Sequence, residues 1–327
     1  MRRAIAEAPV GDDVFGEDPS IRRLEAMSAE RTGKEAALFV ASGTMSNLVA
    51  IMTHCGRGDE AITGSESHIL HYEVAGAAGV AGVQLRPVRN DTHGRMDPNE
   101  VEATIRGENV HLPATTLLCL ENTHNRCSGT VIRPEEIETL ADVAHRRGVR
   151  VHIDGARIFN AAIALETTVA SLAAPADSVG FCLSKGLGAP VGSVLCGSAE
   201  FIARARKMRK MVGGGMRQGG IIASAGVYAL EHMVDRLADD HANAKVLARG
   251  LGELPMVDLD PEAIETNIII FGVRGDWVGL ARSMKEAGVL STVTAPGRLR
   301  MVTHYGIERP DIDEALERVH DAAAALA

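Results

Sequence analysis

Residues 149–192 read VRVHIDGARIFNAAIALETTVASLAAPADSVGFCLSKGLGAPVG, and this stretch decides the fold. Two short apolar runs, 149–153 and 179–183, predict buried strands; the first leads into Asp154 and the second into Ser184 and Lys185. The carboxyl ends of strands in an open parallel sheet collect at one crevice. The sequence therefore predicts that Asp154 and Lys185 face one ligand.

This pairing of an acid with an amine has a specific chemical meaning. A lysine can bind the aldehyde of pyridoxal phosphate (PLP) as a Schiff base, and a carboxylate can keep the pyridine nitrogen protonated so that the ring accepts electrons. Each residue also has a plainer interpretation. An aspartate after a strand is often a turn or helix cap, and a lysine before Gly-Leu-Gly is often a solvated loop residue. The prediction of a PLP site therefore depends on further residues that converge there.

The composition is that of an ordinary globular protein of enzyme size. The chain has 327 residues, of which 46% are hydrophobic and 24% are charged, which fits two domains or one large α/β domain with an appendage. A net charge of −9 argues against nucleic acid as a partner. Five cysteines without a CxxC pair indicate reduced thiols in a cytoplasmic protein. We expect no membrane span, no signal peptide and no metal site.

Strands and helices are expected to alternate up to about residue 200. A helix begins after Asp18 and ends near Gly33, and a strand covers residues 36–40. A second helix follows the small polar turn Ser42-Gly43-Thr44. This alternation predicts an α/β fold with a mostly parallel, doubly wound sheet.

The pattern changes near residue 237. Beyond it, a long helical pattern is followed by short strands and a final helix, which fits a compact unit of roughly ninety residues. We therefore expect a large domain over residues 1–236 and a smaller C-terminal α/β domain over residues 237–327. In the smaller domain, Arg298 and Arg300 are two residues apart in a predicted strand and should share a face.

Several polar residues follow predicted strands and are candidates for the same site. Ser42-Gly43-Thr44 lies where backbone N–H groups and hydroxyls can face a phosphate, although Ser and Thr at a helix start are also plain N-caps. His68 lies at a turn into an Ala/Gly-rich helix, where an imidazole either stacks on an aromatic cofactor or caps the helix. His124 follows a strand in the run ENTHN. Gly213-Gly214-Gly215 before Arg217 is either an anion site or a hinge.

Taken together, these blocks resemble a known family. The sequence resembles the low-specificity L-threonine aldolases of the aspartate aminotransferase-like (fold-type I) group of PLP enzymes. The resemblance covers nearly the whole chain, in the blocks APVGDDVFGEDP, GKEAALF, SGTMSNLVA, LENTHN, VHIDGARIFNA, CLSKGLGAPVGS, RKMVGGGMRQGG and RLRMVTH. It implies a large PLP-binding domain, a smaller C-terminal domain and pyridoxal 5'-phosphate as the cofactor.

The resemblance also implies roles for individual residues. Lys185 resembles the Schiff-base lysine, Asp154 the partner of the pyridine nitrogen, and His68 the histidine that stacks on the ring. Arg157 resembles the group near the phenolic oxygen and the substrate carboxylate, and Arg300 the arginine that binds this carboxylate. His124 resembles a second active-site histidine, which contacts the substrate. The contacts to the cofactor phosphate are implied for Ser42, Gly43, Thr44 and Ser184 and, from a neighbouring subunit, for Lys210 and Arg217.

The expected reaction is cleavage of L-threonine or L-allo-threonine at the Cα–Cβ bond, which yields glycine and acetaldehyde. Either His68 or His124 is expected to take the hydroxyl proton, because imidazole titrates near neutral pH. The alternatives are other reactions on the same scaffold, namely β-elimination, transamination or serine hydroxymethyl transfer, and an inactive, PLP-free scaffold protein. A nucleotide-binding protein is disfavoured because the sequence lacks GxxxxGK[ST].

The resemblance further implies a homotetramer, a dimer of dimers with sites between subunits. The expected partner is a small amino-acid substrate, with neither nucleic acid nor a membrane. Family members usually begin with a strand containing Arg-Ser-Asp-Thr, whose serine reaches the substrate carboxylate, whereas this sequence begins inside the helix that follows. We therefore expect that either the sequence is truncated or this contact is missing.

Overall fold

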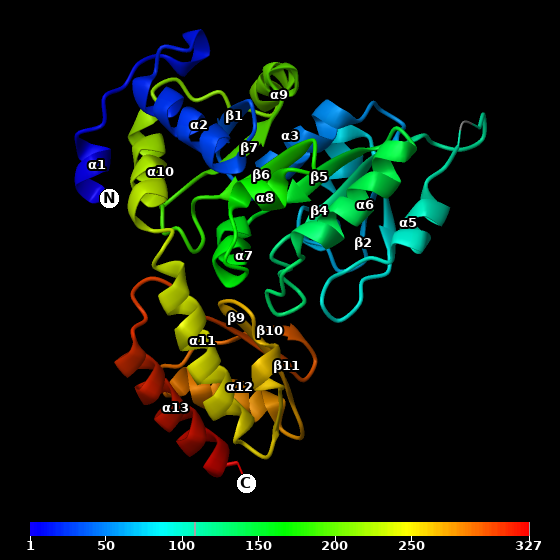
Figure 1. Cartoon of the computed structure of the whole chain (residues 1–327). Helices are drawn as coiled ribbons and strands as arrows, with labels where there is room; N and C mark the ends of the chain where they lie inside the picture. The colour runs from blue at the N-terminus through cyan, green and yellow to red at the C-terminus, as the bar shows by residue number, and fades with distance from the viewer. Residues whose placement is uncertain (108, 327) are drawn as a thin grey trace.

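The computed structural model describes residues 1–107 and 109–326 and is built on two sheets. Seven strands form the larger sheet, which lies across the upper part of Figure 1. In their order across the sheet, they are β1 (Ala36–Val40), β7 (Ser193–Gly197), β6 (Ser178–Cys182), β5 (Arg150–Asp154), β4 (Thr115–Glu121), β2 (Glu60–Gly64) and β3 (Gln84–Val88). The predicted α/β class with a mostly parallel sheet is confirmed.

The direction of the strands brings their carboxyl ends to one edge. Strands β6, β5, β4, β2 and β3 are parallel, and β7 is antiparallel to both β1 and β6. The register pairs Glu121 of β4 with Asp154 of β5, and Asp154 with Gly180 of β6. The two predicted strands of the opening stretch are therefore neighbours, and Asp154 lies at the carboxyl edge between them.

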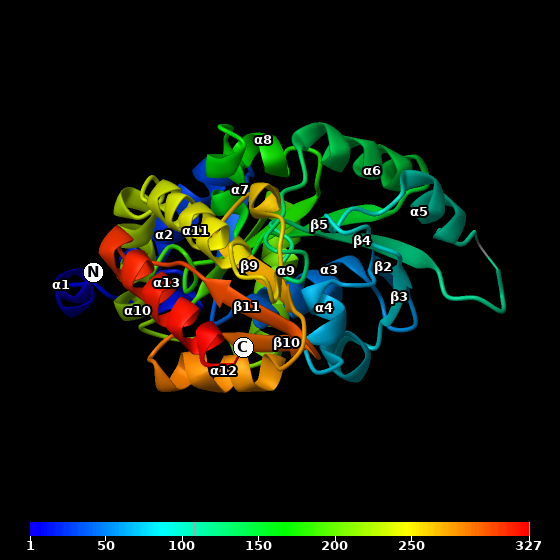
Figure 2. The same ribbon diagram turned by 90° about the horizontal axis from the view of Figure 1, so that it is seen from below.

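Helices cover both faces of the large sheet, as Figure 2 shows from below. One face carries α2 (Pro19–Thr32), α5 (Pro98–Thr104), α6 (Pro134–Arg146) and α8 (Val169–Ala173), and the other carries α3 (Gly43–His54) and α9 (Ala199–Met211). Strand β4 contributes to both layers, because Leu118 and Leu120 pack in one core while Leu117 and Cys119 pack in the other. Burial on both faces explains why its sequence is a continuous apolar run.

Asp18 fixes the start of two helices. Its Oδ1 accepts hydrogen bonds of 3.0 Å from the backbone N–H groups of Ser20 and Ile21, and Pro19 occupies the first turn of α2. Its Oδ2 accepts a 3.0 Å bond from the N–H of Gly220, the first residue of α10 (Gly220–His232). Helix α2 ends at Gly33, whose φ of 65° is the left-handed conformation that favours glycine. The predicted beginning and end of α2 are confirmed.

The second sheet and its helices form a smaller unit, drawn in yellow to red in Figure 1. Its strands are ordered β10 (Thr292–Ala295), β11 (Arg298–Val302), β9 (Ile268–Val273) and β8 (Val257–Asp258), and its helices are α11 (Leu237–Gly252), α12 (Trp277–Glu286) and α13 (Arg309–Ala324). These helices pack on one face of the sheet, over Ile269, Phe271, Leu299 and Met301. The predicted boundary between residues 236 and 237 falls where α11 begins and stays a prediction.

The expected Ala/Gly-rich helix after His68 is wrong. The chain forms only the short α4 (His68–His71), bends at Val74 and Ala75, which have φ of 51° and 54°, and continues as the π-helical turn η2 (Ala77–Ala81). The bend follows from Glu73, whose carboxylate is buried and hydrogen-bonded to His68 and Asn47. Holding this carboxylate inside turns the backbone out of a regular helix.

The remaining elements are short. They are α1 (Arg2–Ala6), η1 (Asp13–Phe15), α7 (Ile158–Ala164) and η3 (Pro261–Ala263). Among the described residues, no helix combines the length and the apolar character that crossing a bilayer requires.

The central strand should be sensitive to loss of volume. Leu118→Ala removes a fully buried side chain of β4, so we expect the free energy of unfolding to fall by about 2–5 kcal/mol. Urea denaturation of both proteins measures the loss. Val110→Ala is the control, because Val110 is 93% exposed and should change stability by less than about 0.5 kcal/mol. Equal losses in the two variants would contradict this packing.

Candidate active site

A cavity of about 550 Å³ lies between the carboxyl edge of the large sheet and the small sheet. Lys185, His68, Asn125 and Arg157 line it from the large sheet, and Ile270, Arg298 and Arg300 line it from the small one. Arg300 pairs with Ile270 in the register of β11 and β9, while Leu299 and Met301 face the helices on the opposite side. The prediction that Arg298 and Arg300 share a face is therefore confirmed.

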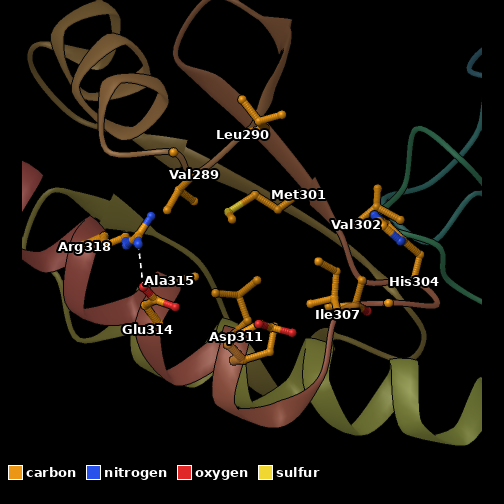
Figure 3. A pocket seen from close by; sticks show the side chains of 15 residues that line it. Val289, Leu290, Met301, Val302, His304, Ile307, Asp311, Glu314, Ala315 and Arg318 are labelled. Carbon is orange, nitrogen blue, oxygen red and sulfur yellow. Dashed lines mark hydrogen bonds and ion pairs between the residues drawn. The ribbon is translucent and has the colours of Figure 1, made fainter.

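A second cavity, of about 370 Å³, lies within the small unit (Figure 3). Leu290, Met301 and Ile307 give it apolar walls, and of its charged side chains Asp311, Glu314 and Arg318, the last two form an ion pair with each other on α13. None of the lysine, aspartate or histidine candidates lines this cavity. The cavity beside Lys185 is therefore the candidate active site.

Lys185 follows β6 in a tight turn. The turn is closed by a 2.9 Å hydrogen bond from the N–H of Gly188, which has a φ of 74°, to the carbonyl of Lys185. The side chain of Lys185 is half-buried and reaches the cavity, whereas Ser184 is exposed and is not among the lining residues. Gly188 therefore serves the turn, as its positive φ requires.

Asp154 belongs to a buried acidic cluster beside the cavity. The side chains of His68, Glu73 and Asp154 each place an atom within 4.8 Å of the others. His68 Nδ1 lies 2.9 Å from Glu73 Oε1, and Asn47 Nδ2 donates to both Glu73 Oε1 at 2.7 Å and Asp154 Oδ2 at 2.8 Å. The hydrogen bond that His68 donates to Glu73 raises the pKa of His68, while burial raises the pKa of Glu73.

Two arginines meet in the cavity without a carboxylate. Arg157 Nη1 and Arg300 Nη2 both donate to Asn125 Oδ1, at 3.4 Å and 2.9 Å, and neither forms an ion pair within residues 1–107 and 109–326. Burial, and to a smaller extent the positive charge of Arg300, lower the pKa of Arg157 to about 10. Two guanidinium groups that share one neutral acceptor form a site for an anion, because a planar carboxylate can bind both.

The turn Ser42-Gly43-Thr44 is the N-terminus of α3. Ser42 Oγ accepts a 3.2 Å hydrogen bond from the N–H of Met45, so the capping interpretation is confirmed. Ser42 and Thr44 are exposed, and a Cβ on Gly43 would lie 2.8 Å from Cys182 Sγ. The hydroxyl groups of Ser42 and Thr44 and the first N–H groups of α3 are accessible from solvent, so a phosphate can reach them as predicted.

Lys210 and Arg217 do not line the cavity of their own chain. Lys210 is exposed near the end of α9, and Arg217 is exposed and bound to Asp12 through a 2.6 Å ion pair. Their expected role toward the cofactor of a neighbouring subunit stays a prediction.

The structure places His124 away from the cavity. Its backbone pairs with Thr130, its ring is buried, and both ring nitrogens lack a partner among the described residues. A Cβ on Gly94 would lie only 2.5 Å from this ring, so the 91–95 turn packs directly on it. Of the two histidines expected as the base, His68 lines the cavity and His124 does not.

Sequence reasoning missed three residues that organise the site. Asn125 is the shared acceptor of the two arginines, and Glu121 accepts from the N–H groups of His68 at 2.6 Å and of Asn125 at 2.8 Å. Glu73 holds the His68 ring. Asn125 and Glu121 could have been found from the sequence, because both lie in the block LENTHN. No sequence pattern marks Glu73 beyond its nearness to His68.

The fold and this site define a class of enzyme. The model of the beta-eliminating lyase family matches residues 1–273. A low-specificity L-threonine aldolase of Arabidopsis thaliana is 45% identical over 323 residues, covering 97% of this chain and 90% of its own length. The Escherichia coli low specificity L-threonine aldolase is 41% identical over 315 residues, covering 96% and 92%.

A solved structure agrees with the fold. The Leishmania major threonine aldolase superposes with a TM-score of 0.83 at 20% identity, over 100% of this chain and 94% of its own. The chain belongs to the low-specificity L-threonine aldolase family within the beta-eliminating lyases.

The unpaired arginines lead to a prediction for stability. Asn125→Asp places a carboxylate between Arg157 and Arg300, so we expect it to raise the free energy of unfolding by about 1 kcal/mol over the original chain. Asn125→Ala removes the acceptor and should be the least stable of the three proteins. Denaturant titrations at low salt test this order, and an Asp variant no more stable than the Ala variant would contradict it.

Proposed function

We propose that this chain is a PLP-dependent aldolase that cleaves L-threonine and L-allo-threonine to glycine and acetaldehyde. The relatives named for this reaction match over nearly their whole length. The observation that carries the proposal is the position of Lys185 in the same cavity as the unpaired Arg157 and Arg300. An amine for an aldehyde and two guanidinium groups for a carboxylate are what PLP chemistry on an amino acid requires.

The residues present fit PLP. Lys185 supplies the amine, Asp154 a buried carboxylate for the ring nitrogen, and His68 a flat ring on one side of the cavity. Ser42, Gly43 and Thr44, with Ser184, offer exposed hydroxyls and the N-terminus of a twelve-residue helix for the phosphate. The Nε atoms of Arg157 and Arg300 are buried and have no hydrogen-bond partner among residues 1–107 and 109–326, which also indicates that a polar ligand belongs here. When bound, PLP supplies the electron sink for the breaking Cα–Cβ bond.

Arg157 and Arg300 bind the substrate carboxylate, which replaces Asn125 Oδ1 as their hydrogen-bond acceptor. Charge-assisted hydrogen bonds from two fixed guanidinium groups restrict rotation of the substrate and set the direction of its Cα–Cβ bond. Ile270 and the strand β10 cover the same cavity, which limits access of water to the reacting atoms.

His68 accepts the proton of the β-hydroxyl group. Its Nδ1 is held by Glu73, which orients the ring, so the proton is received at Nε2. Asp154 holds a proton on the ring nitrogen; its carboxylate is kept in place by Asn47 at 2.8 Å and by the N–H of Ala156 at 3.2 Å. His68 thus receives the β-hydroxyl proton, and Asp154 holds the proton of the ring nitrogen.

The finer properties of the family belong to the same proposal. Five free cysteines fit a reducing, cytoplasmic location. A homotetramer, built as a dimer of dimers, would bring Lys210 and Arg217 of one subunit to the phosphate site of another. A domain boundary between residues 236 and 237 would let the arginines of the small sheet move with α11.

Loss of the lysine separates the aldolase from a PLP-free scaffold. We expect the purified protein with PLP to show a visible absorbance band and to release acetaldehyde from threonine. Lys185→Ala should lose both, because no other lysine lines the cavity in the described part of the chain. Spectra and a coupled aldehyde assay measure this, with Lys207→Ala as the surface control.

The aldehyde assay also separates the alternatives on this scaffold. β-Elimination of threonine would give a keto acid and ammonia instead, and transamination would convert the bound cofactor to its amine form. Threonine and allo-threonine that yield no glycine and acetaldehyde would contradict the aldolase proposal.

The pH dependence of kcat should report the His68–Glu73 contact. The hydrogen bond that His68 donates to Glu73 raises the pKa of His68, so the ring stays protonated to a higher pH and becomes a base only above that raised value. We expect kcat to rise with pH through this range. Glu73→Gln should move the rise to lower pH, and His68→Asn should lower kcat and remove the rise. An unchanged profile in the Gln variant would contradict the assignment of His68.

A further inference from the structure

A continuous chain of hydrogen bonds runs behind Asp154, through the interior of the large sheet. It begins at His54 at the end of α3, passes through Ser178 of β6 and His152 of β5, and reaches Asn47 in the first half of α3. His54 Nε2 and His152 Nδ1 each lie 2.8 Å from Ser178 Oγ, and His152 Nε2 lies 3.2 Å from Asn47 Oδ1. None of these four residues lines the candidate active site.

The direction of every bond in this chain is determined by its last member. Asn47 faces two carboxylates, Glu73 and Asp154, so its Nδ2 hydrogens point to them and its Oδ1 must accept. His152 therefore donates from Nε2 and accepts at Nδ1. Ser178 consequently donates its hydroxyl proton to His152 and accepts from His54.

Burial favours the neutral form of the imidazole rings of His152 and His54. His152 is fully buried, and desolvation lowers its pKa to about 4. Desolvation also lowers the pKa of His54 to about 3. A neutral ring has one donor and one acceptor, which is the arrangement that the directed chain requires at His152.

We propose that Asn47, His152 and Ser178 are positioning residues that keep the carboxylate of Asp154 aimed at the cofactor nitrogen. The inference rests on the proposed role of Asp154. Two buried carboxylates side by side repel each other, so one of them takes up a proton unless donors stabilise the charge. Asn47 supplies a donor to each acid, and His152 and Ser178 fix the orientation of that amide. Without them the amide can turn its oxygen toward Asp154.

The charged groups at the two ends of this hydrogen-bond chain are consistent with a positioning role for its residues. On the cavity side, Asp154 and Glu73 face His68, and Glu73 shares its Oε1 between His68 and Asn47. At the other end, His54 borders a polar cavity of about 530 Å³ with Lys34, Arg150, Asp177 and Arg204 in its wall. No charged side chain bonds to His152, Ser178 or Asn47 among the described residues, apart from the two acids that Asn47 serves. His54, Ser178, His152 and Asn47, called the relay below, thus form an uncharged row of hydrogen bonds that ends on a carboxylate.

Paired substitutions of His152 and Ser178 test the proposal. The measurements are the dissociation constant of PLP from the holoenzyme, followed by its visible band, and kcat for threonine. His152→Leu and Ser178→Ala should each weaken PLP binding by about threefold to tenfold and lower kcat by a similar factor, as expected for one lost hydrogen bond between neutral groups. His152→Gln can place an amide N–H near the position of Nε2 and should restore most of both.

The control for Ser178→Ala is Thr53→Val. Thr53 is also buried, but its hydroxyl bonds to Val49 within α3 and not to the relay. If Ser178→Ala behaves as Thr53→Val does, the relay has no positioning role and the inference is overturned, even where His152→Leu fails to fold. Nitrogen-15 spectra of the histidines in the apoprotein give a second readout, because the Nε2–H tautomer is expected at His152 and the Nδ1–H tautomer would overturn the bond direction.

Asp154→Ala separates this inference from the proposed function. If that variant binds PLP and turns over threonine as the original protein does, the assigned role of Asp154 is wrong and the inference falls with it, while the aldolase proposal stands. If Asp154→Ala loses turnover while the His152 and Ser178 variants match Thr53→Val, the aldolase proposal stands and the relay alone is rejected.

Discussion

The register of β4, β5 and β6 is the constraint on which the site depends. It sets Glu121, Asp154 and Gly180 at one level, so the three loops that follow these strands leave the sheet side by side. Those loops carry Asn125, Arg157 and Lys185, all of which line one cavity. A slip of one residue in β5 would turn Asp154 to the opposite face of the sheet. Burial of both faces prevents that slip, because the inward apolar residues of β4 and β5 would then meet the wrong layer.

The site separates its charges. Glu73 and Asp154 share Asn47 beside His68, whereas Arg157 and Arg300 converge on Asn125. Neutral amides hold both groups in place without neutralising them. The acidic side suits a protonated ring nitrogen and a histidine base, and the basic side suits a carboxylate.

Much of the fold was predictable because local signals agreed with each other. Asp18 and Gly33 bounded α2, and the apolar runs before Asp154 and Lys185 were neighbouring strands. The segment after His68 was not predictable, because a buried Glu73 overrode the helix propensity of alanine. His124 and Asn125 are adjacent in sequence, yet only the asparagine reaches the cavity. Sequence motifs located this loop, but which of its side chains turns inward depends on packing, here on the 91–95 turn over the His124 ring.

Strand β1 lies at the edge of the sheet and pairs with β7, which is made much later in the chain. During synthesis on the ribosome, Leu38, Phe39 and Val40 therefore emerge long before the strand that hydrogen-bonds to them exists. An apolar strand with an open edge is prone to wrong pairing, and non-local pairing is slow to form. The large sheet thus cannot be completed until more than half of the polypeptide has been translated, and the edge of β1 stays open to wrong pairing for that interval.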